Sequence, residues 1–390
     1  MEERLEIEEK DPVRVVVVGG GVGGTLVANL LARRLAGRAA IELVTASPWH
    51  VYEPALLYVP FDDLPQVDVQ RPERDLLRPE VALVDTPAVR IDTAGRRLLM
   101  RSGLELRYDY LVLATGSELA PEALPGFAEG AHHFATVAAA ERLHDAMFRF
   151  TGGRIVIGAA QLPHKHPQAM LEFAFLLADH CERNGLAGRT EIVFATPAER
   201  PFHELELARI AEQRFDERGI RFVPHVKPAA IRADQRLLVA QGGVEIPYDL
   251  LVMAPPERGV ALVRDSNLGD GEGWLPTDPE TLRLRGARDV WVLGDCSDLV
   301  VARAPSAASR QARVVAEAIA ADFLGKRPRS SLAAYDGTVE MFVEMGDGQA
   351  AFVDADYERA AAVQEPSRAI AAGKRAFDRA YWQLVPTGLV

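Results

Sequence analysis

Cysteine is almost absent from this sequence. The 390 residues contain two cysteines, Cys181 and Cys296. Two cysteines cannot form the disulfide framework of a small secreted protein, and their separation matches no zinc-ligand spacing. We therefore expect free thiols in a reducing cytoplasm, and no metal site.

The sequence also lacks a long apolar run and an excess of positive charge. No stretch of about 18 apolar residues occurs, and the first residues, MEERLEIEEKDPVR, are acidic where a signal peptide is basic. We expect no membrane-spanning helix, which still allows the protein to lie on a membrane surface. The 44 Lys and Arg against 56 Asp and Glu give a net charge of -12, which disfavours a nucleic-acid partner.

The apolar side chains that are present suffice for two or three globular domains. Hydrophobic residues make up 48% of the chain and charged residues 26%. The β-branched run Val15–Val18 is followed by glycines, a helical pattern over 25–36 and the apolar run Ile41–Val44. This order of strand, turn, helix and strand predicts a right-handed crossover in a parallel sheet.

The same pattern recurs in the second third of the chain. RIVIGAA from Arg154 is predicted as a strand, Ala169–Arg183 as a helix, and TEIVFATP from Thr190 as the next strand. A later strand, VWVLGDCSDL, precedes a helix predicted over Ser309–Phe323, and the residues from Ser330 end in an aromatic helix. The sequence therefore predicts an α/β protein with two Rossmann-like domains and a small C-terminal α+β cap.

A glycine motif lies between the first predicted strand and helix. Gly19, Gly21 and Gly24 form G-x-G-x-x-G. Gly19 permits a tight turn, Gly21 lets the backbone approach a pyrophosphate, and Gly24 allows the helix to pack closely on the strand. The helix N-terminus adds free N–H groups and the positive end of its dipole. The motif predicts a dinucleotide site, and a glycine-rich turn without a ligand is the alternative.

The acidic residue that normally ends the second strand of such a site is missing. Thr45 and Ser47 stand there instead. A hydroxyl can bond to a ribose, but the bond is neutral and therefore weaker than a charge-assisted one. We expect weaker recognition of the adenosine ribose beside an intact pyrophosphate site.

Two distant segments, YDYLVLATGS and VWVLGDCSDL, resemble those of the two-dinucleotide-domain flavoproteins of the pyridine nucleotide disulfide oxidoreductase superfamily. The resemblance implies that Ala114, Thr115 and Gly116 lie against FAD and that Asp295 binds its ribityl chain. A helix N-cap is the alternative role of Asp295. Further cofactor-binding residues implied in the same way are Gly20, Pro54, Val89 and Gly294.

The resemblance also divides the chain into three parts. It implies a discontinuous FAD-binding domain of residues 11–127 and 268–328, and a cap of residues 329–390. The second Rossmann-like domain, residues 128–267, lacks the glycine motif, and Pro163 and Pro167 remove backbone donors where a pyrophosphate needs them. We therefore expect no NADH site there, which argues against a type II NADH dehydrogenase.

Nearly the whole chain resembles the sulfide:quinone oxidoreductases and the flavoprotein subunit of flavocytochrome c sulfide dehydrogenase, as in VYEPALLYVPF, GWLPTDPETLR and KRAFDRAYW. The resemblance places His166 at the family's redox cysteine, Glu172 at the family's glutamate and Met341 at the partner cysteine. Sulfide oxidation in the family proceeds through thiolate attack and a persulfide, a route that is closed here. Cys181 and Cys296 fit neither role and are expected to be buried.

Other residues are candidates for the role that the redox cysteines have in the family. His164 and His166, on an extended segment, would point the same way, and either can donate a proton near the flavin with Glu172 as a relay. His166 merely filling the vacated space is the alternative, and an H-x-H pair without a third ligand predicts no metal. Arg303, at the family's basic position, is expected to stabilise reduced flavin, although Pro305 replaces the family's glycine.

The C-terminal segment is amphipathic, aromatic and basic. In the relatives such a tail docks on the membrane and frames a quinone pocket, which implies a peripheral membrane contact through residues 373–390. A helix that caps the protein's own core, or a homodimer contact, is the alternative. The side chains near helical spacing are Phe377, Tyr381, Leu384 and Val385, with Trp382, Lys374, Arg375 and Arg379 around them.

These observations predict a FAD-dependent oxidoreductase that passes electrons from an unidentified small donor, a sulfur compound among the candidates, to a quinone or protein acceptor. We expect it in the cytoplasm, peripherally on the inner face of the membrane. Two alternatives stay open. One is a catalytically degenerate FAD-binding protein that serves as a binding or assembly partner, and the other is a type II NADH dehydrogenase-like enzyme.

Overall fold

The structure is a computed structural model that describes residues 12–62, 68–329 and 332–389. Residue 11, the predicted start of the first domain, lies outside the described residues. So do the acidic N-terminus, Ser330 and Ser331 of the predicted cap, and Val390 at the end of the predicted membrane contact.

The first domain is built on a parallel five-stranded sheet with strand order β19-β9-β1-β2-β5. Its central strand β1 is fully covered, because α1 and α7 pack on the face of Val15 and Val17 while an antiparallel meander covers the face of Val16 and Val18. The elements of this domain are β1 (Val13–Val18), α1 (Val22–Leu35), β2 (Ala39–Val44), β5 (Val81–Val84), β9 (Tyr110–Leu113), β19 (Val290–Val292), α7 (Pro305–Phe323) and the meander β6 (Ala88–Asp92), β7 (Arg97–Met100) and β8 (Glu105–Arg107).

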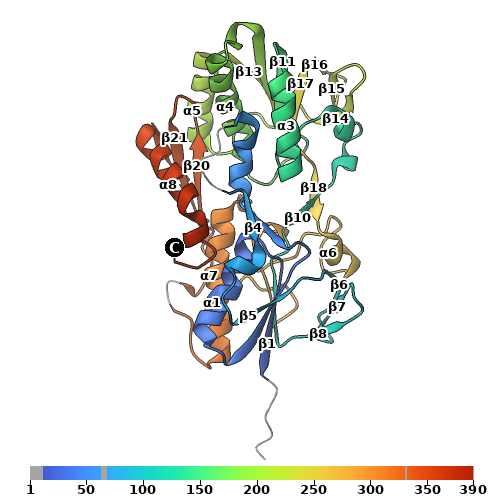
Figure 1. The fold of residues 1–390 in the computed structure, drawn as a ribbon, viewed down its shortest axis with the longest axis vertical. Helices are drawn as coiled ribbons and strands as arrows, with labels where there is room; N and C mark the ends of the chain where they lie inside the picture. The colour runs from blue at the N-terminus through green and yellow to red at the C-terminus, as the bar shows by residue number, and fades with distance from the viewer. Residues whose placement is uncertain (1–11, 63–67, 330–331, 390) are drawn as a thin grey trace, which may run out of the picture.

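The second domain repeats this plan with strand order β13-β12-β11-β17, again all parallel. It lies at the top of Figure 1, above the first domain. The fold class predicted from the sequence, two Rossmann-like α/β units, is confirmed. The elements are α3 (Val137–Arg149), β11 (Gly153–Ala159), α4 (Ala169–Arg183), β12 (Thr190–Ala195), α5 (Leu205–Arg218), β13 (Ile220–Val223), β17 (Leu250–Ala254) and the meander β14 (Pro228–Arg232), β15 (Leu237–Ala240) and β16 (Glu245–Pro247).

Small elements join the two domains and add the cap. A two-stranded antiparallel ribbon of β10 and β18 connects the domains, and the cap is an antiparallel sheet of three strands followed by α8. The bounds are β3 (Trp49–Val51), η1 (Glu53–Leu57), η2 (Val59–Phe61), β4 (Gln70–Pro72), η3 (Glu73–Leu76), β10 (Ser117–Leu119), η4 (Pro121–Ala123), α2 (Phe127–Gly130), η5 (Ala187–Arg189), β18 (Glu257–Gly259), α6 (Ala261–Asp265), η6 (Gly294–Cys296), β20 (Val339–Glu344), β21 (Ala350–Ala355), β22 (Ala362–Ser367) and α8 (Arg368–Leu384).

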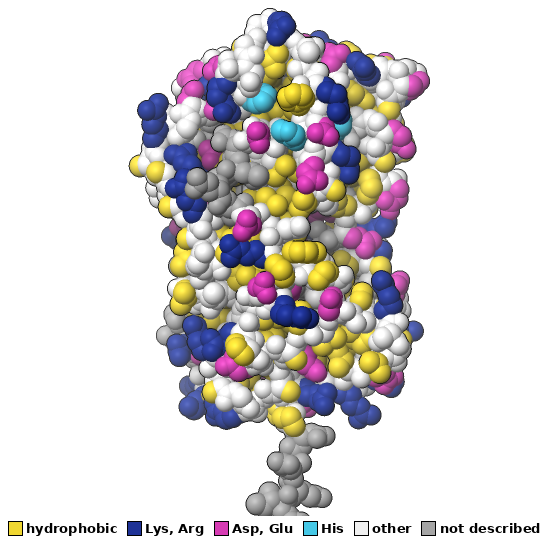
Figure 2. Space-filling view, in the orientation of Figure 1, with side chains coloured by type: hydrophobic (Ala, Val, Ile, Leu, Met, Phe, Trp, Pro, Cys, Tyr) yellow, Lys and Arg dark blue, Asp and Glu magenta, His cyan; other side chains and the backbone are white. Residues whose placement is uncertain are grey.

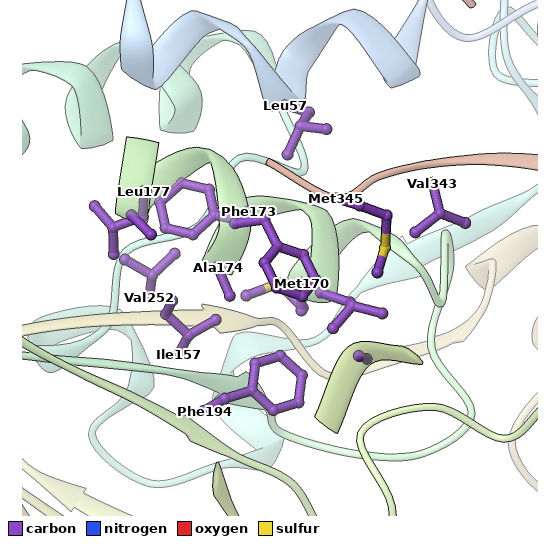
Figure 3. Packing of buried hydrophobic residues seen from close by; sticks show 14 of the residues in the cluster. Leu57, Ile157, Met170, Phe173, Ala174, Leu177, Phe194, Val252, Val343 and Met345 are labelled. Carbon is purple, nitrogen blue, oxygen red and sulfur yellow. The ribbon is translucent and has the colours of Figure 1, made fainter. Parts of the chain in front are cut away.

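Helix α4 holds the second domain and the cap together. Figure 3 shows Met170 and Phe173 of α4 between Ile157 of the sheet and Met345, which follows cap strand β20. Most residues of α4 are buried, as expected for a helix that is apolar on nearly all sides. Glu172 is also carried inside, onto the face that meets β20.

The long helix before the cap starts earlier than the sequence predicted. We expected Ser309, but α7 begins at Pro305. Proline suits the first helical position because its fixed φ is helical and its missing N–H would be unpaired there anyway.

No helix in the described part of the chain is both long and apolar enough to cross a bilayer. The face shown in Figure 2 has basic and acidic side chains interspersed.

Candidate active site

The glycine turn has the shape of a pyrophosphate cradle. Gly19 has φ +117° and a Cβ there would collide with the carbonyl of Ala114, while a Cβ at Gly24 would collide with the carbonyl of Gly19. Gly21 instead faces open space, and a Cβ at this residue would meet nothing within 4 Å. No acid lies in the first turn of α1 to repel a phosphate. The turn therefore fits the dinucleotide predicted from the motif.

Three strand ends bring the remaining cofactor residues to the same edge. Because β1, β9 and β19 are neighbours, the glycine turn, the ATG segment and the GD segment follow adjacent carboxyl ends. Gly116 has φ +64° and open space at its Cβ. The N–H of Gly294 donates to Gln311 Oε1 (2.7 Å), which fixes the turn that carries Asp295.

The other predicted cofactor residues occupy varied positions. The hydroxyl of Thr45 donates to the carbonyl of Ser47 (2.8 Å), and the hydroxyl of Ser47 bonds to the backbone of Trp49, so both are engaged in the turn after β2. A Cβ at Gly20 would crowd Thr45. Val89 is the extra residue of a β-bulge between β6 and β7, and Pro54 lies in η1. Their contacts with FAD stay predictions.

A cavity of about 1010 Å³ lies where the two domains and the cap meet. His164, His166, Glu172 and Met341, the residues that the sequence placed around the lost cysteines, all line it. Cys181 and Cys296 are buried and free, as expected, and no thiol is among the described residues that line the cavity.

The lining of the cavity includes an ion cluster that the sequence did not reveal. Lys165 Nζ lies 2.7 Å from Glu53 Oε2 and 3.4 Å from Asp295 Oδ2. His166 Nε2 lies 2.9 Å from the same carboxylate of Glu53, and His166 Nδ1 is buried without a hydrogen-bond partner among the described residues. The cluster joins η1, the loop before α4 and the GD turn.

The two histidines of the H-K-H segment differ in environment, and the expectation of an extended segment is wrong. His166 has φ +51°, a left-handed conformation, and its N–H donates to the carbonyl of Arg303 (2.9 Å). Burial lowers the pKa of His164 to about 4, so its ring is neutral near pH 7. His164 Nδ1 lies 2.9 Å from the carbonyl of Lys165.

The guanidinium of Arg303 contacts an aromatic ring and a carboxylate. It stacks over the ring of Trp274, 3.7 Å from its centroid, and lies 3.9 Å from Glu257. Burial raises the pKa of Glu257, whose carboxylate also accepts a hydrogen bond from Ser117. The predicted effect of Arg303 on the flavin stays a prediction.

The lining of the cavity also includes a second buried ion cluster. Glu172 Oε1 accepts the N–H of Glu344 (2.9 Å), and Lys374 Nζ lies 4.0 Å from Glu172, 3.9 Å from Glu344 and 3.7 Å from Asp378. Desolvation raises the pKa of Glu172 from 4.5 to about 8 despite the opposing charge of Lys374. Glu172 is therefore mainly protonated near pH 7, while Lys374 stays charged because the carboxylates around it raise its pKa despite its burial. Tyr58 donates to Glu344 (2.8 Å).

Buried hydrogen bonds and one aromatic stack link this cluster to helix α1. Tyr52 donates to Asp378 and stacks on Tyr381, with ring centroids 3.9 Å apart. The hydroxyl of Tyr381 lies 2.8 Å from His50 Nε2, and His50 Nδ1 lies 3.2 Å from Glu73, which accepts the hydroxyl of Thr25. The cap helix is thus tied to the helix that opens the dinucleotide site.

Most aromatic side chains of the tail helix pack inside the protein, and the predicted membrane contact through residues 373–390 stays a prediction. Tyr381, Trp382 and Val385 pack with Tyr52 in the protein's own core. The indole N–H of Trp382 donates to the carbonyl of Asp68 (3.0 Å). An amphipathic helix has one apolar face, and here that face is used internally, as the alternative interpretation of the tail expected. Phe377, 37% exposed, stays at the surface.

The start of the second Rossmann unit is unlike that of the first. Three residues separate β1 from α1, whereas residues 160–168 separate β11 from α4. The N–H of Ala169 is used by the carbonyl of His166, and Glu172 stands in the first turn of α4. These features disfavour a pyrophosphate at this helix N-terminus.

Sequence reasoning missed Glu53, Lys165, Lys374, Asp378 and Tyr381 as parts of these clusters. One signal was available: the chain has five lysines among 44 basic residues, and two of them line the cavity.

The family model described as "Pyridine nucleotide-disulphide oxidoreductase" matches residues 13–312. The mitochondrial sulfide:quinone oxidoreductase of Mus musculus is 24% identical over 362 residues, 89% of this chain and 79% of the relative. An external alternative NAD(P)H-ubiquinone oxidoreductase of Solanum tuberosum is 22% identical over 326 residues, 75% of this chain and 56% of the relative.

Among solved structures, the sulfide:quinone oxidoreductase of Aquifex aeolicus superposes with a TM-score of 0.84 at 21% identity, over 96% of this chain and 92% of that chain. The family match covers both Rossmann-like units, and the glycine turn and the ATG and GD segments fit its cofactor. The chain therefore belongs to the pyridine nucleotide-disulphide oxidoreductase family, as an FAD-binding flavoprotein similar to the sulfide:quinone oxidoreductases.

Proposed function

We propose that this protein passes electrons from a small donor, without a protein thiol, through FAD to a quinone bound in the central cavity. The observation that carries the proposal is the protonated Glu172 beside Lys374 on the wall of that cavity. Bound FAD supplies the two-electron redox chemistry, and the protein supplies the binding groups and the protons.

The acceptor side of the cavity suits a quinone. A quinone takes up two protons with two electrons, so its site needs a proton source near the ring oxygens. Glu172 can donate a proton at neutral pH, and the ammonium of Lys374 can hold a carbonyl oxygen. Phe342 and Phe377 line the same cavity and offer apolar contact to the ring. The names of the relatives from Mus musculus and Solanum tuberosum include a quinone acceptor.

The proposed site of the electron donor differs from that of an enzyme that oxidises its donor with a cysteine thiol. His166 replaces the family's cysteine, is held by Glu53, and can accept or donate a proton as the donor is oxidised. Without a thiol in the described cavity lining, a persulfide route has no attacking atom. The long turn before α4 argues against a nicotinamide donor.

An anaerobic titration of the purified yellow protein tests the proposal. FAD absorbance is followed while sulfide, NADH, NADPH and small thiols are added, and a soluble quinone analogue is then supplied. We expect no rapid bleaching by NADH or sulfide, and rapid reoxidation of chemically reduced protein by the quinone. Rapid bleaching by NADH would establish the type II NADH dehydrogenase-like alternative, and failure of the quinone to reoxidise the protein would refute the quinone assignment.

The missing thiols also favour a second candidate, a flavoprotein that has lost catalysis and acts as an assembly partner. It predicts retained FAD, no turnover with any donor and quinone, and a stable complex that is isolated with the full chain. Turnover in the titration would exclude it.

We further propose that the protein works in the cytoplasm against the inner face of the membrane, from which a quinone can enter the cavity. Phe377 lies at the surface and lines the cavity, which supports an entrance beside α8. Flotation of the full chain with vesicles tests this, and loss of flotation in Phe377→Ser is the expected result.

A further inference from the structure

The ammonium of Lys165 lies at the point where the two domains meet the predicted flavin. It is 3.4 Å from Asp295, the residue of the first domain that is proposed to hold the ribityl chain. Lys165 itself comes from the loop before α4 in the second domain, so the contact crosses the domain boundary. A cation in contact with this carboxylate is close enough to the predicted FAD site to interact electrostatically with the cofactor.

Hydrogen bonds and ion pairs hold the loop around Lys165 in place. The next residue, His166, is held by Glu53 through its ring and by the carbonyl of Arg303 through its N–H. The ammonium is itself anchored by Glu53 at 2.7 Å. Burial lowers the pKa of Lys165, but the charges of Glu53 and Asp295 outweigh this and raise it above its usual value. The side chain therefore carries a fixed positive charge at all ordinary pH values.

Two other basic residues that the sequence singled out make other contacts. Arg303, the expected flavin-tuning cation, stacks on Trp274 and faces Glu257. Lys374 lies among Glu172, Glu344 and Asp378 at the other cluster. Of these three cations, Lys165 is the one whose charged group contacts Asp295.

We propose that the Lys165–Glu53 pair sets how strongly the protein prefers reduced over oxidised FAD, with Lys165 favouring the reduced state and Glu53 opposing it. Reduction adds electrons to the cofactor, so a nearby positive charge stabilises the product and a nearby carboxylate destabilises it. This inference rests on the proposed place of Asp295 beside the flavin.

The test measures the midpoint potential of bound FAD in the wild type and in Lys165→Met, Glu53→Gln and the double variant. We expect Lys165→Met to weaken the preference for reduced FAD about tenfold. For a two-electron couple this lowers the midpoint potential by about 30 mV. Glu53→Gln is expected to strengthen it by a similar factor, and the double variant to return near the wild type. Lys165→Arg keeps the charge and serves as the control with little change.

The signs of the shifts separate an electrostatic role from a structural one. If the pair only braces the fold, both single variants lose FAD or shift the same way, and that result would overturn the proposal. If Lys165→Met fails to bind FAD, the direction for Glu53→Gln alone decides, because a lower potential contradicts it. Asp295→Asn is tested separately for FAD affinity: unchanged affinity would refute the proposed place of Asp295, whereas the shifts report on Lys165.

Discussion

Replacing Glu172 by glutamine provides a quantitative test of the buried cluster. Glutamine has the same shape but cannot ionise, so Glu172→Gln isolates the effect of the carboxyl proton. The pKa of Glu172 is about 8 in the folded protein, against 4.5 for an ordinary glutamate, chiefly because the group is buried. The unfolded chain therefore binds fewer protons than the folded one between these two values, and stability falls as pH rises.

The magnitude follows from the same two values. Each pH unit between them costs about 1.4 kcal/mol of unfolding free energy. Between about pH 6 and pH 8 the wild type should therefore lose about 2 kcal/mol relative to Glu172→Gln. Well below pH 4.5 the carboxyl is protonated in both states, so the stability difference between the two proteins should no longer change with pH.

Two measurements check this reasoning. Urea unfolding of both proteins at matched pH gives the difference in stability, with Glu212→Gln on the exposed face of α5 as the control that should show no such trend. Infrared difference spectra of wild type minus Glu172→Gln should show a protonated carboxyl band that disappears near pH 8. A band absent at pH 6, or a stability difference that does not change with pH, would show that Glu172 is ionised and would remove the proposed proton donor.

Three further changes test other parts of the structure. Gly24→Ala places a methyl group against the backbone of the dinucleotide turn and should yield colourless or insoluble protein, whereas Gly188→Ala, where a Cβ meets nothing within 4 Å, should stay yellow and soluble. Lys374→Met leaves buried carboxylates without their cation and should cost about 3 to 5 kcal/mol in urea unfolding, so wild-type stability would contradict the cluster. Tyr381→Phe leaves His50 Nε2 without its partner and should cost about 1 to 3 kcal/mol by the same measurement. Unchanged stability would show that this link between the cap helix and α1 contributes nothing.

Local sequence patterns predicted much of the fold. The valine run became the central strand β1, and the helix expected over Ala169–Arg183 has these bounds as α4. Such features depend on residues close in the chain: apolar runs, helical periodicity and glycines whose Cβ would collide with backbone. The glycine turn could be predicted for the same reason.

Predictions that relied on local conformation alone were weaker. His164 and His166 were expected on an extended segment, but His166 is left-handed because its N–H and its ring are bound by Arg303 and Glu53, which are distant in sequence. Amphipathicity predicted an apolar face on the last helix but not that Tyr52, far away in the sequence, packs against it.

By itself the sequence determined the two Rossmann-like units and the dinucleotide turn, because each is written in a contiguous run of residues. Only the tertiary structure decided the chemistry of the cavity. Lys165 is 112 residues from Glu53, and Tyr52 is 326 residues from Asp378, yet each pair is in contact. Polar side chains that are so far apart in the sequence come into contact only when the domains and the cap pack together. Burial then shifts their pKa values and so decides which of them are protonated.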